Sequence, residues 1–175
     1  MERRWFMEPV ILLIDDSEND SMLLDYAFKK AGLAHPLRVV RDGVDAISYL
    51  LGRGAFSDRV EYPLPDILLI DLNMPRLNGL ELLAWLKTQP DLQHLTVVVL
   101  TGSARKEEIN IAYQMGAKSY LVKPSQSQTM QRLIDSFFQY WVVHNHPPDP
   151  APSADLPPES ARTLGRNSLE SRQMI

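Results

Sequence analysis

Five polar side chains follow directly after short apolar runs in this sequence. They are Asp15 and Asp16 after residues 10–14, Asp71 after 67–70, Thr101 after 96–100, and Lys123 after 119–122. Three carboxylates that lie close together repel one another, so one must be protonated unless a cation lies among them. Because this set contains no Cys or His, it suits Mg²⁺, which takes one or two carboxylates from a protein and keeps several waters.

The ammonium group and the hydroxyl extend this chemistry to an anion. Lys123 brings a fixed positive charge and Thr101 a hydrogen-bond donor, and with a metal ion they would surround the oxygens of a phosphoryl group in transfer. Asp71 could then be the nucleophile and form an aspartyl phosphate. Taken singly, an Asp-Asp pair is often a helix cap and a Lys-Pro step often a turn. The joint arrangement is what indicates a site.

The elements that must position these side chains are five strands alternating with five helices. Strands are predicted over 10–14, 37–40, 67–70, 96–100 and 119–122, and helices over 17–31, 44–51, 80–87, 106–115 and 125–141. The strands are apolar on consecutive side chains, which is typical of a sheet covered on both faces. We therefore predict an α/β fold with a doubly wound parallel sheet of order 2-1-3-4-5 and five flanking helices. The carboxyl ends of parallel strands share one edge, so the five polar side chains should meet in one pocket.

One domain is expected over residues 10–144. Residues 1–9 form an extension, whose Trp5 and Phe6 we expect to pack on the domain. Residues 145–175 are proline-rich and poor in large apolar side chains, which predicts disorder. Residues 52–65 are too long for an ordinary helix-to-strand connection, so we interpret them as an inserted loop.

Composition excludes several classes of function. A net charge of -4 without a basic block argues against nucleic acid as a partner. With no Cys there is no disulfide framework or thiol nucleophile, in keeping with a reducing compartment. No apolar run is long enough to span a membrane, and the charged start lacks the core of a signal peptide. We expect a cytoplasmic protein that binds neither membrane nor nucleic acid.

Residues 10–140 resemble the receiver domain of two-component response regulators, a flavodoxin-like fold. The matching motifs are the acidic pair Asp15-Asp16, the run LLIDLNMPRLNGLELL around Asp71, the step Thr101-Gly102-Ser103, and Lys123-Pro124. The resemblance implies that Asp71 accepts a phosphoryl group from a sensor histidine kinase. It also implies a Mg²⁺ site made by Asp16, Asp71 and the backbone carbonyl of Asn73, with Asp15 acting through a metal-bound water.

Further roles follow from the same resemblance. Thr101 would swing toward the new phosphoryl group, Lys123 would pair with it, and Tyr120 would be the aromatic switch residue that rotates inward. The Lys123–Pro124 bond is expected to be cis. Such a chain is not an enzyme, but a phospho-acceptor that assists its own phosphorylation and slow dephosphorylation.

The inserted loop and the single-domain layout without a DNA-binding domain resemble those of response regulators that partner bacterial phytochromes. A bacteriophytochrome kinase is therefore among the expected partners. Four aromatic residues, Phe137, Phe138, Tyr140 and Trp141, crowd the last helix. We expect a homodimer through this helix, with core packing of half of these aromatics as the alternative.

Three other classes of protein share parts of this pattern. Dehalogenase-like phosphohydrolases also use an aspartyl nucleophile, but they carry it on the first strand and place the acidic pair last. A flavin or nucleotide binder would need a glycine-rich loop after the first strand, where this chain has DDSEND. A receiver-like adaptor that works without phosphorylation stays open, although every pocket residue is present.

Overall fold

A computed structural model describes residues 9–34 and 36–145, so the predictions for the first eight residues and for 146–175 lie outside the described chain. Its centre is a five-stranded sheet of order β2-β1-β3-β4-β5, with every neighbouring pair parallel. The strands are β1 (Ile11–Ile14), β2 (Arg38–Val40), β3 (Ile67–Ile70), β4 (Thr96–Thr101) and β5 (Ser119–Val122). The predicted sheet and its strand order are confirmed.

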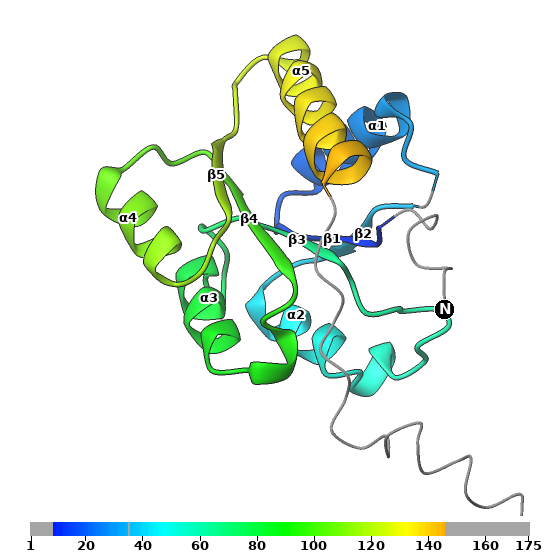
Figure 1. Cartoon of the computed structure of the whole chain (residues 1–175), viewed down its shortest axis with the longest axis vertical. Helices are drawn as coiled ribbons and strands as arrows, with labels where there is room; N and C mark the ends of the chain where they lie inside the picture. The colour runs from blue at the N-terminus through cyan, green and yellow to red at the C-terminus, as the bar shows by residue number, and fades with distance from the viewer. Residues whose placement is uncertain (1–8, 35, 146–175) are drawn as a thin grey trace, which may run out of the picture.

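Helices cover both faces of the sheet (Figure 1). They are α1 (Glu18–Ala31), α2 (Gly43–Leu50), α3 (Gly79–Lys87), α4 (Lys106–Gln114) and α5 (Ser127–Phe137), with short 3₁₀ turns η1 (Gly54–Phe56) and η2 (Pro90–Leu92) and a π-helical continuation of α5, η3 (Phe138–His144). Helices α1 and α5 lie side by side on one face, and α2, α3 and α4 cover the other (Figure 1). This is the doubly wound arrangement that the alternation of elements predicts.

Two hydrophobic cores follow from the pleat of the strands. Leu12 and Ile14 of β1 point to the side of α2 and α3, whereas Ile11 and Leu13 point to the side of α1 and α5. The same alternation holds along β3 and β4. Because successive side chains of a strand face opposite ways, a run such as ILLI fills both cores at once.

The aromatic end of the last helix is packed more fully than we expected. Phe137 and Phe138 are both buried, and Phe137 makes an edge-to-face contact with Phe28 of α1. Trp141 is partly buried against the same core, which leaves Tyr140 as the exposed aromatic of the four. Core packing of half of these aromatics, the alternative given above, agrees with the burial of Phe137 and Phe138, because α5 packs against α1 and the helix continues past Phe137. The homodimer stays a prediction.

The inserted loop 52–65 is held to the end of α2. The guanidinium of Arg59 donates to the carbonyls of Tyr49 (2.8 Å), Leu50 (2.7 Å) and Tyr62 (3.2 Å). The rings of Tyr49, Phe56 and Tyr62 pack against one another with centroids 5.2 to 5.9 Å apart. The last carbonyls of a helix lack i+4 partners within it, and Arg59 supplies donors to those of Tyr49 and Leu50, which fixes the loop to the end of α2.

No helix among residues 9–34 and 36–145 combines the length and the apolar character needed to cross a membrane.

Candidate functional site

Backbone hydrogen bonds align the polar residues that end the strands. The N–H of Asp15 donates to Val40 (3.0 Å), and the N–H of Asp71 donates to Ile14 (2.9 Å). The N–H of Lys123 donates to the carbonyl of Thr101 at 2.7 Å. The ladder thus continues one residue past the strands, and it sets these residues side by side at the carboxyl edge of the sheet.

Lys123 is the centre of the cluster. Its ammonium nitrogen lies 2.7 Å from Asp15, 2.9 Å from Asp71 and 2.9 Å from Asp20. The side chain of Lys123 is 9% exposed and that of Asp15 fully buried, while Asp20 is 39% exposed and reaches the cluster from its solvent side. An ammonium group has three hydrogens, so all three are used by carboxylates.

The charges in this cluster depend on one another. Burial by itself would lower the pKa of Lys123, but the hydrogen bonds that it donates to Asp15, Asp71 and Asp20 together outweigh burial and raise the pKa. Burial raises the pKa of Asp15, against the hydrogen bond and charge of Lys123 and the N–H of Ser17, which lower it. The lysine therefore stays charged at neutral pH, and its hydrogen bond and charge oppose the rise that burial causes in the pKa of Asp15.

The turn after β3 holds Asp71 in a fixed orientation. The N–H of Asn73 donates to one carboxylate oxygen of Asp71 at 3.2 Å, while the other oxygen contacts Lys123. Gly79, at the start of α3, lies so close that a Cβ there would be 2.3 Å from the carbonyl oxygen of Asp71. The close approach requires glycine, since any side chain would push the backbone of Asp71 out of place.

Ion pairs of Arg76 connect the same turn to a neighbouring helix. Arg76, which has a positive φ of 61°, forms ion pairs with Asp42 and with Asp45, the latter at 3.1 Å. Asp42 is buried and also caps α2 by accepting from the N–H groups of Val44 and Asp45. The ion pairs thus tie the turn after β3 to the start of α2, 34 residues earlier.

The acidic cluster offers a suitable set of metal ligands. One carboxylate oxygen from each of Asp15, Asp16 and Asp71 can be chosen so that all lie within 4.8 Å of one another. Asp16 is exposed, so water can reach the ligands from that side. All the candidate donors are oxygens, which is the ligand set that Mg²⁺ and Mn²⁺ prefer. The residues fit a hard divalent cation.

A hydrogen-bonded chain runs from Thr101 to β5. The buried Thr101 hydroxyl lies 3.5 Å from the N–H of Ser103, whose side chain bonds Glu108 of α4. The Tyr120 hydroxyl donates to the carbonyl of Ser103 at 3.0 Å. Movement of Thr101 would therefore change the position of Ser103, and with it the hydrogen bond of Tyr120.

None of the described residues has a cis peptide bond, and the Lys123–Pro124 bond is trans. Our expectation of a cis bond was wrong. A trans bond is the lower-energy form by roughly 0.5 to 1 kcal/mol before proline. The lysine side chain reaches both Asp15 and Asp71 from this backbone, so the site does not require the cis form.

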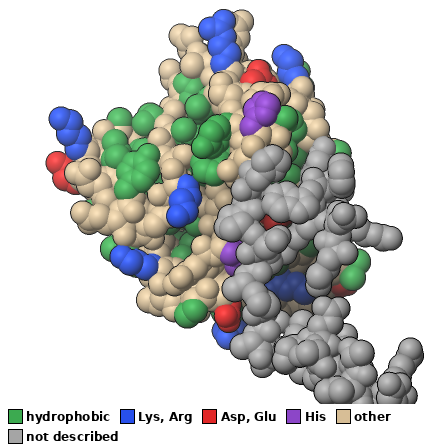
Figure 2. Space-filling view, viewed as in Figure 1, with side chains coloured by type: hydrophobic (Ala, Val, Ile, Leu, Met, Phe, Trp, Pro, Cys, Tyr) green, Lys and Arg blue, Asp and Glu red, His purple; other side chains and the backbone are tan. Residues whose placement is uncertain are grey.

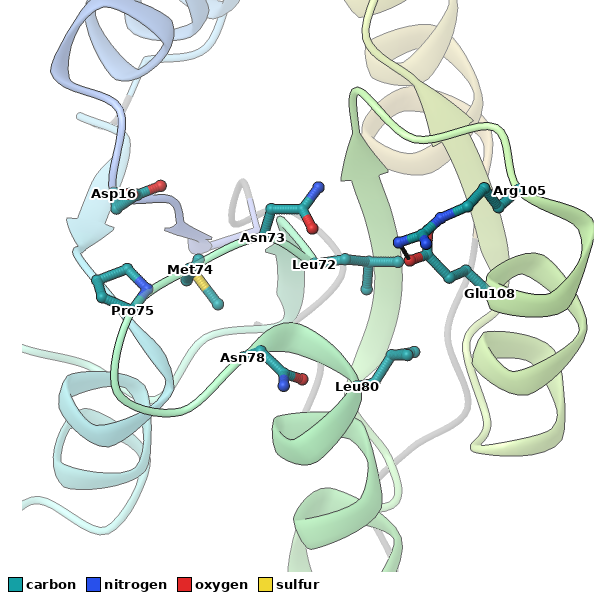
Figure 3. Close-up of a pocket in the computed structure, with 9 residues that line it drawn as sticks. All are labelled: Asp16, Leu72, Asn73, Met74, Pro75, Asn78, Leu80, Arg105 and Glu108. Carbon is teal, nitrogen blue, oxygen red and sulfur yellow. Dashed lines mark hydrogen bonds and ion pairs between the residues drawn. The ribbon is translucent and has the colours of Figure 1, made fainter.

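A pocket of about 540 Å³ opens beside the cluster, between the turns that follow β1, β3 and β4. Asp16 and Asn73 lie on one side of it, and the paired side chains of Arg105 and Glu108 lie on the other (Figure 3). Leu80 of α3 contributes to its floor (Figure 3). A phosphoryl donor could reach the acidic edge through this opening.

Two residues of the site were missed by sequence reasoning. Asp20 lies in the first turn of α1, whose N-cap is Ser17, and its carboxylate contacts Lys123. Its signal was its place five residues after Asp15, in the first turn of a helix that starts at the acidic edge. Arg76 gave no such signal, since its contacts depend on how α2 packs beside the turn.

The sheet order, the acidic edge and the buried lysine define a receiver domain, and the comparison with protein families agrees. Residues 11–135 match the response regulator receiver domain. The chain therefore belongs to the response regulator receiver family.

The matching proteins include other response regulators, one of them a phytochrome response regulator. Response regulator Rcp1 of Synechocystis sp. is 33% identical over 133 residues, covering 76% of this chain and 88% of Rcp1. The crystal structure of its Mn²⁺-bound form matches with a TM-score of 0.73 and 32% identity, over 80% of this chain and 99% of that one. The phosphorylated cyanobacterial phytochrome response regulator RcpA matches with a TM-score of 0.72 and 28% identity, over 81% and 99%.

Proposed function

We propose that this chain is a response regulator in which Asp71 accepts a phosphoryl group from a histidine kinase, in a reaction that depends on Mg²⁺. The observation that carries the proposal is the buried Lys123, which contacts both Asp15 and Asp71 at the edge where Thr101 also lies. The membership of this chain in the receiver family supports the proposal. So do a similar protein that binds Mn²⁺ and another that is phosphorylated.

Asp71 is the nucleophile in this proposal. A carboxylate oxygen forms the new O–P bond as the P–N bond to the kinase histidine breaks. The imidazole, protonated on its other nitrogen, keeps the electron pair of that bond and leaves neutral. Lys123 pairs with the transferred group, and the Thr101 hydroxyl donates to one of its oxygens.

Asp15, Asp16, Asp71 and the backbone carbonyl of Asn73 are the groups that would hold Mg²⁺. When bound, the cation offsets the negative charge that the carboxylates and the phosphoryl group bring together. The chain assists the transfer to itself and a slow hydrolysis afterwards, and it turns over no separate substrate.

The signal leaves through the surface formed by α4, β5 and α5. When Thr101 turns toward the phosphoryl group, its contact with Ser103 changes, and Tyr120 loses the hydrogen bond from its hydroxyl to the carbonyl of Ser103. Hydrophobic side chains are visible on the surface between α4 and α5, over β5 (Figure 2). Tyr113 and Val122 are among the exposed apolar residues of this region. A binding partner there would sense the position of Tyr120.

The partners in this proposal are proteins of a cytoplasmic signalling pathway. The similarity to a cyanobacterial phytochrome response regulator supports a bacteriophytochrome as the kinase. The exposed Tyr140 and Val143 at the end of the last helix would support a homodimer through that helix. A second copy is one way for the signal to be read, and a different target protein is another.

The test is the intact mass of the protein after incubation with acetyl phosphate, with and without Mg²⁺. We expect the gain of one phosphoryl group, which requires Mg²⁺ and is lost in Asp71→Asn. Asp91→Asn, at an exposed carboxylate outside the site, is the matched control and should be modified as the wild type is. An unchanged mass in the wild type under all conditions would refute the proposal and favour an adaptor that works without phosphorylation.

A further inference from the structure

We infer that Asp20 is a positioning residue of this site, which holds Lys123 and thereby sets the balance between binding a divalent cation and binding a phosphoryl group. This inference rests on the proposed function, since it concerns the same lysine. It starts from the contact of 2.9 Å between Asp20 and the Lys123 ammonium nitrogen.

The ammonium group has one hydrogen for each of its three carboxylate partners. Asp15 and Asp71 are also candidate metal ligands, whereas Asp20 lies outside that group. A cation that draws in Asp15 and Asp71 leaves Asp20 as the carboxylate that still holds the lysine. Asp20 therefore still accepts one hydrogen of the ammonium when its other two partners are engaged, and that hydrogen is not available to a phosphoryl group.

A purely helical role does not account for this contact. Asp20 lies in the first turn of α1, where its own N–H donates to the hydroxyl of Ser17. A carboxylate there is favourable to the helix dipole whichever way it points. Glu18 occupies the same turn and is exposed, so it has the dipole effect without the contact.

The charge of Asp20 acts with opposite sign on the two ligands of the site. Four carboxyl groups, those of Asp15, Asp16, Asp20 and Asp71, lie around the one positive charge of Lys123. A fourth carboxylate attracts a divalent cation more strongly, but it repels a phosphoryl group and competes with it for the hydrogens of Lys123. Removal of this one charge should therefore weaken cation binding and strengthen phosphoryl binding.

The distance sets the size of the effect. Asp20 and Asp71 both contact Lys123 at 2.9 Å, so their oxygens lie within about 6 Å of each other. Two charges at that distance change an equilibrium constant by roughly threefold in water and by about a hundredfold in a poorly solvated site. Because Asp20 is 39% exposed, we expect an effect of about threefold to tenfold.

The experiment compares Asp20→Asn with Glu18→Gln, which removes the same charge from the same helical turn. Calorimetry of the full chain with Mg²⁺ alone gives the cation affinity. Fluorine NMR at saturating Mg²⁺ gives the affinity for beryllofluoride, which stands in for the phosphoryl group on Asp71. For Asp20→Asn we expect weaker Mg²⁺ binding and tighter beryllofluoride binding, each by about threefold to tenfold. Glu18→Gln should stay within about twofold of the wild type in both.

The outcomes separate this inference from the proposed function. If the wild type binds Mg²⁺ and beryllofluoride and Asp20→Asn matches it, Asp20 is only a helix residue. If both affinities fall in Asp20→Asn and also in Glu18→Gln, the effect is a general one of charge or folding, and the inference is overturned. If the wild type binds neither ligand, the proposed function itself fails.

Discussion

Replacement of Lys123 by methionine would remove the single cation from a buried acidic cluster while it keeps the volume of the side chain. Asp15 is fully buried and Asp71 is 11% exposed, so both would be left with little water to stabilise their charges. Loss of one partner of a buried ion pair typically costs 3 to 5 kcal/mol. Asp16 and Asp20 admit water on one side of the cluster, so we expect the low end, about 3 kcal/mol in the free energy of unfolding at pH 7 without metal.

The stability that Lys123→Met loses should depend on pH in a definite direction. Burial already raises the pKa of Asp15, and without Lys123 the pKa would rise further. An acid whose pKa is higher in the folded state destabilises the fold as the pH rises, so the deficit of Lys123→Met should shrink as the pH falls from 7 toward 5. In the wild type the pKa of Lys123 is raised, so its contribution is fully present below its ordinary pKa of 10.5 and is lost only at more alkaline pH.

Urea denaturation followed by tryptophan fluorescence measures both effects, since Trp85 packs against one core and Trp141 against the other. Lys118→Met, at an exposed lysine just before β5, is the matched control and should lose little stability. Mg²⁺ should stabilise Lys123→Met more than the wild type, because the cation replaces the lost positive charge. The reasoning is refuted if Lys123→Met is as stable as the wild type at pH 7 without metal, or if its deficit grows as the pH falls.

Other changes test the parts around the site. Gly79→Ala should cost about 2 kcal/mol in the free energy of unfolding and weaken Mg²⁺ binding measured by calorimetry, because its Cβ would press on the carbonyl of Asp71; an unchanged affinity would contradict this. Arg59→Ala should lower stability by about 1 kcal/mol in urea denaturation but leave acetyl phosphate labelling unchanged, since the loop it holds lies away from the acidic edge; slower labelling would show that the loop acts on the site. Met22 and Tyr26 are large apolar side chains exposed one turn apart on α1. Replacing both by Ser should slow phosphoryl transfer from a kinase several-fold and leave the rate of labelling by acetyl phosphate unchanged. A rate of transfer from the kinase equal to that of the wild type would exclude this surface as the docking site.

Much of the fold could be predicted because its signals are local. The run ILLI occurs at both β1 and β3, and each is a continuous apolar stretch that only a sheet covered on both faces would bury. The structure places these strands within one residue of the predicted limits. The strand order followed from a general preference among doubly wound sheets and not from any residue.

The convergence of the polar side chains was also predictable, because it follows from topology alone. Parallel strands bring their carboxyl ends to one edge, so Asp15, Asp71, Thr101 and Lys123 meet whatever the details of packing. Asp20 was not recognised, because a first-turn acid is common on helices and its direction depends on the exact position of Lys123.

Local patterns in the sequence are enough to predict the helices and strands, their order along the chain and the types of side chain that end the strands. Only the tertiary structure decided which carboxylates share Lys123, how Arg76 reaches Asp42, and how many aromatics of the last helix are buried. The physical reason is the range of the interactions involved. Periodicity and turn formers act over a few neighbouring residues, whereas ion pairs and packing join residues tens of positions apart and depend on distances of a few ångströms that no local pattern encodes.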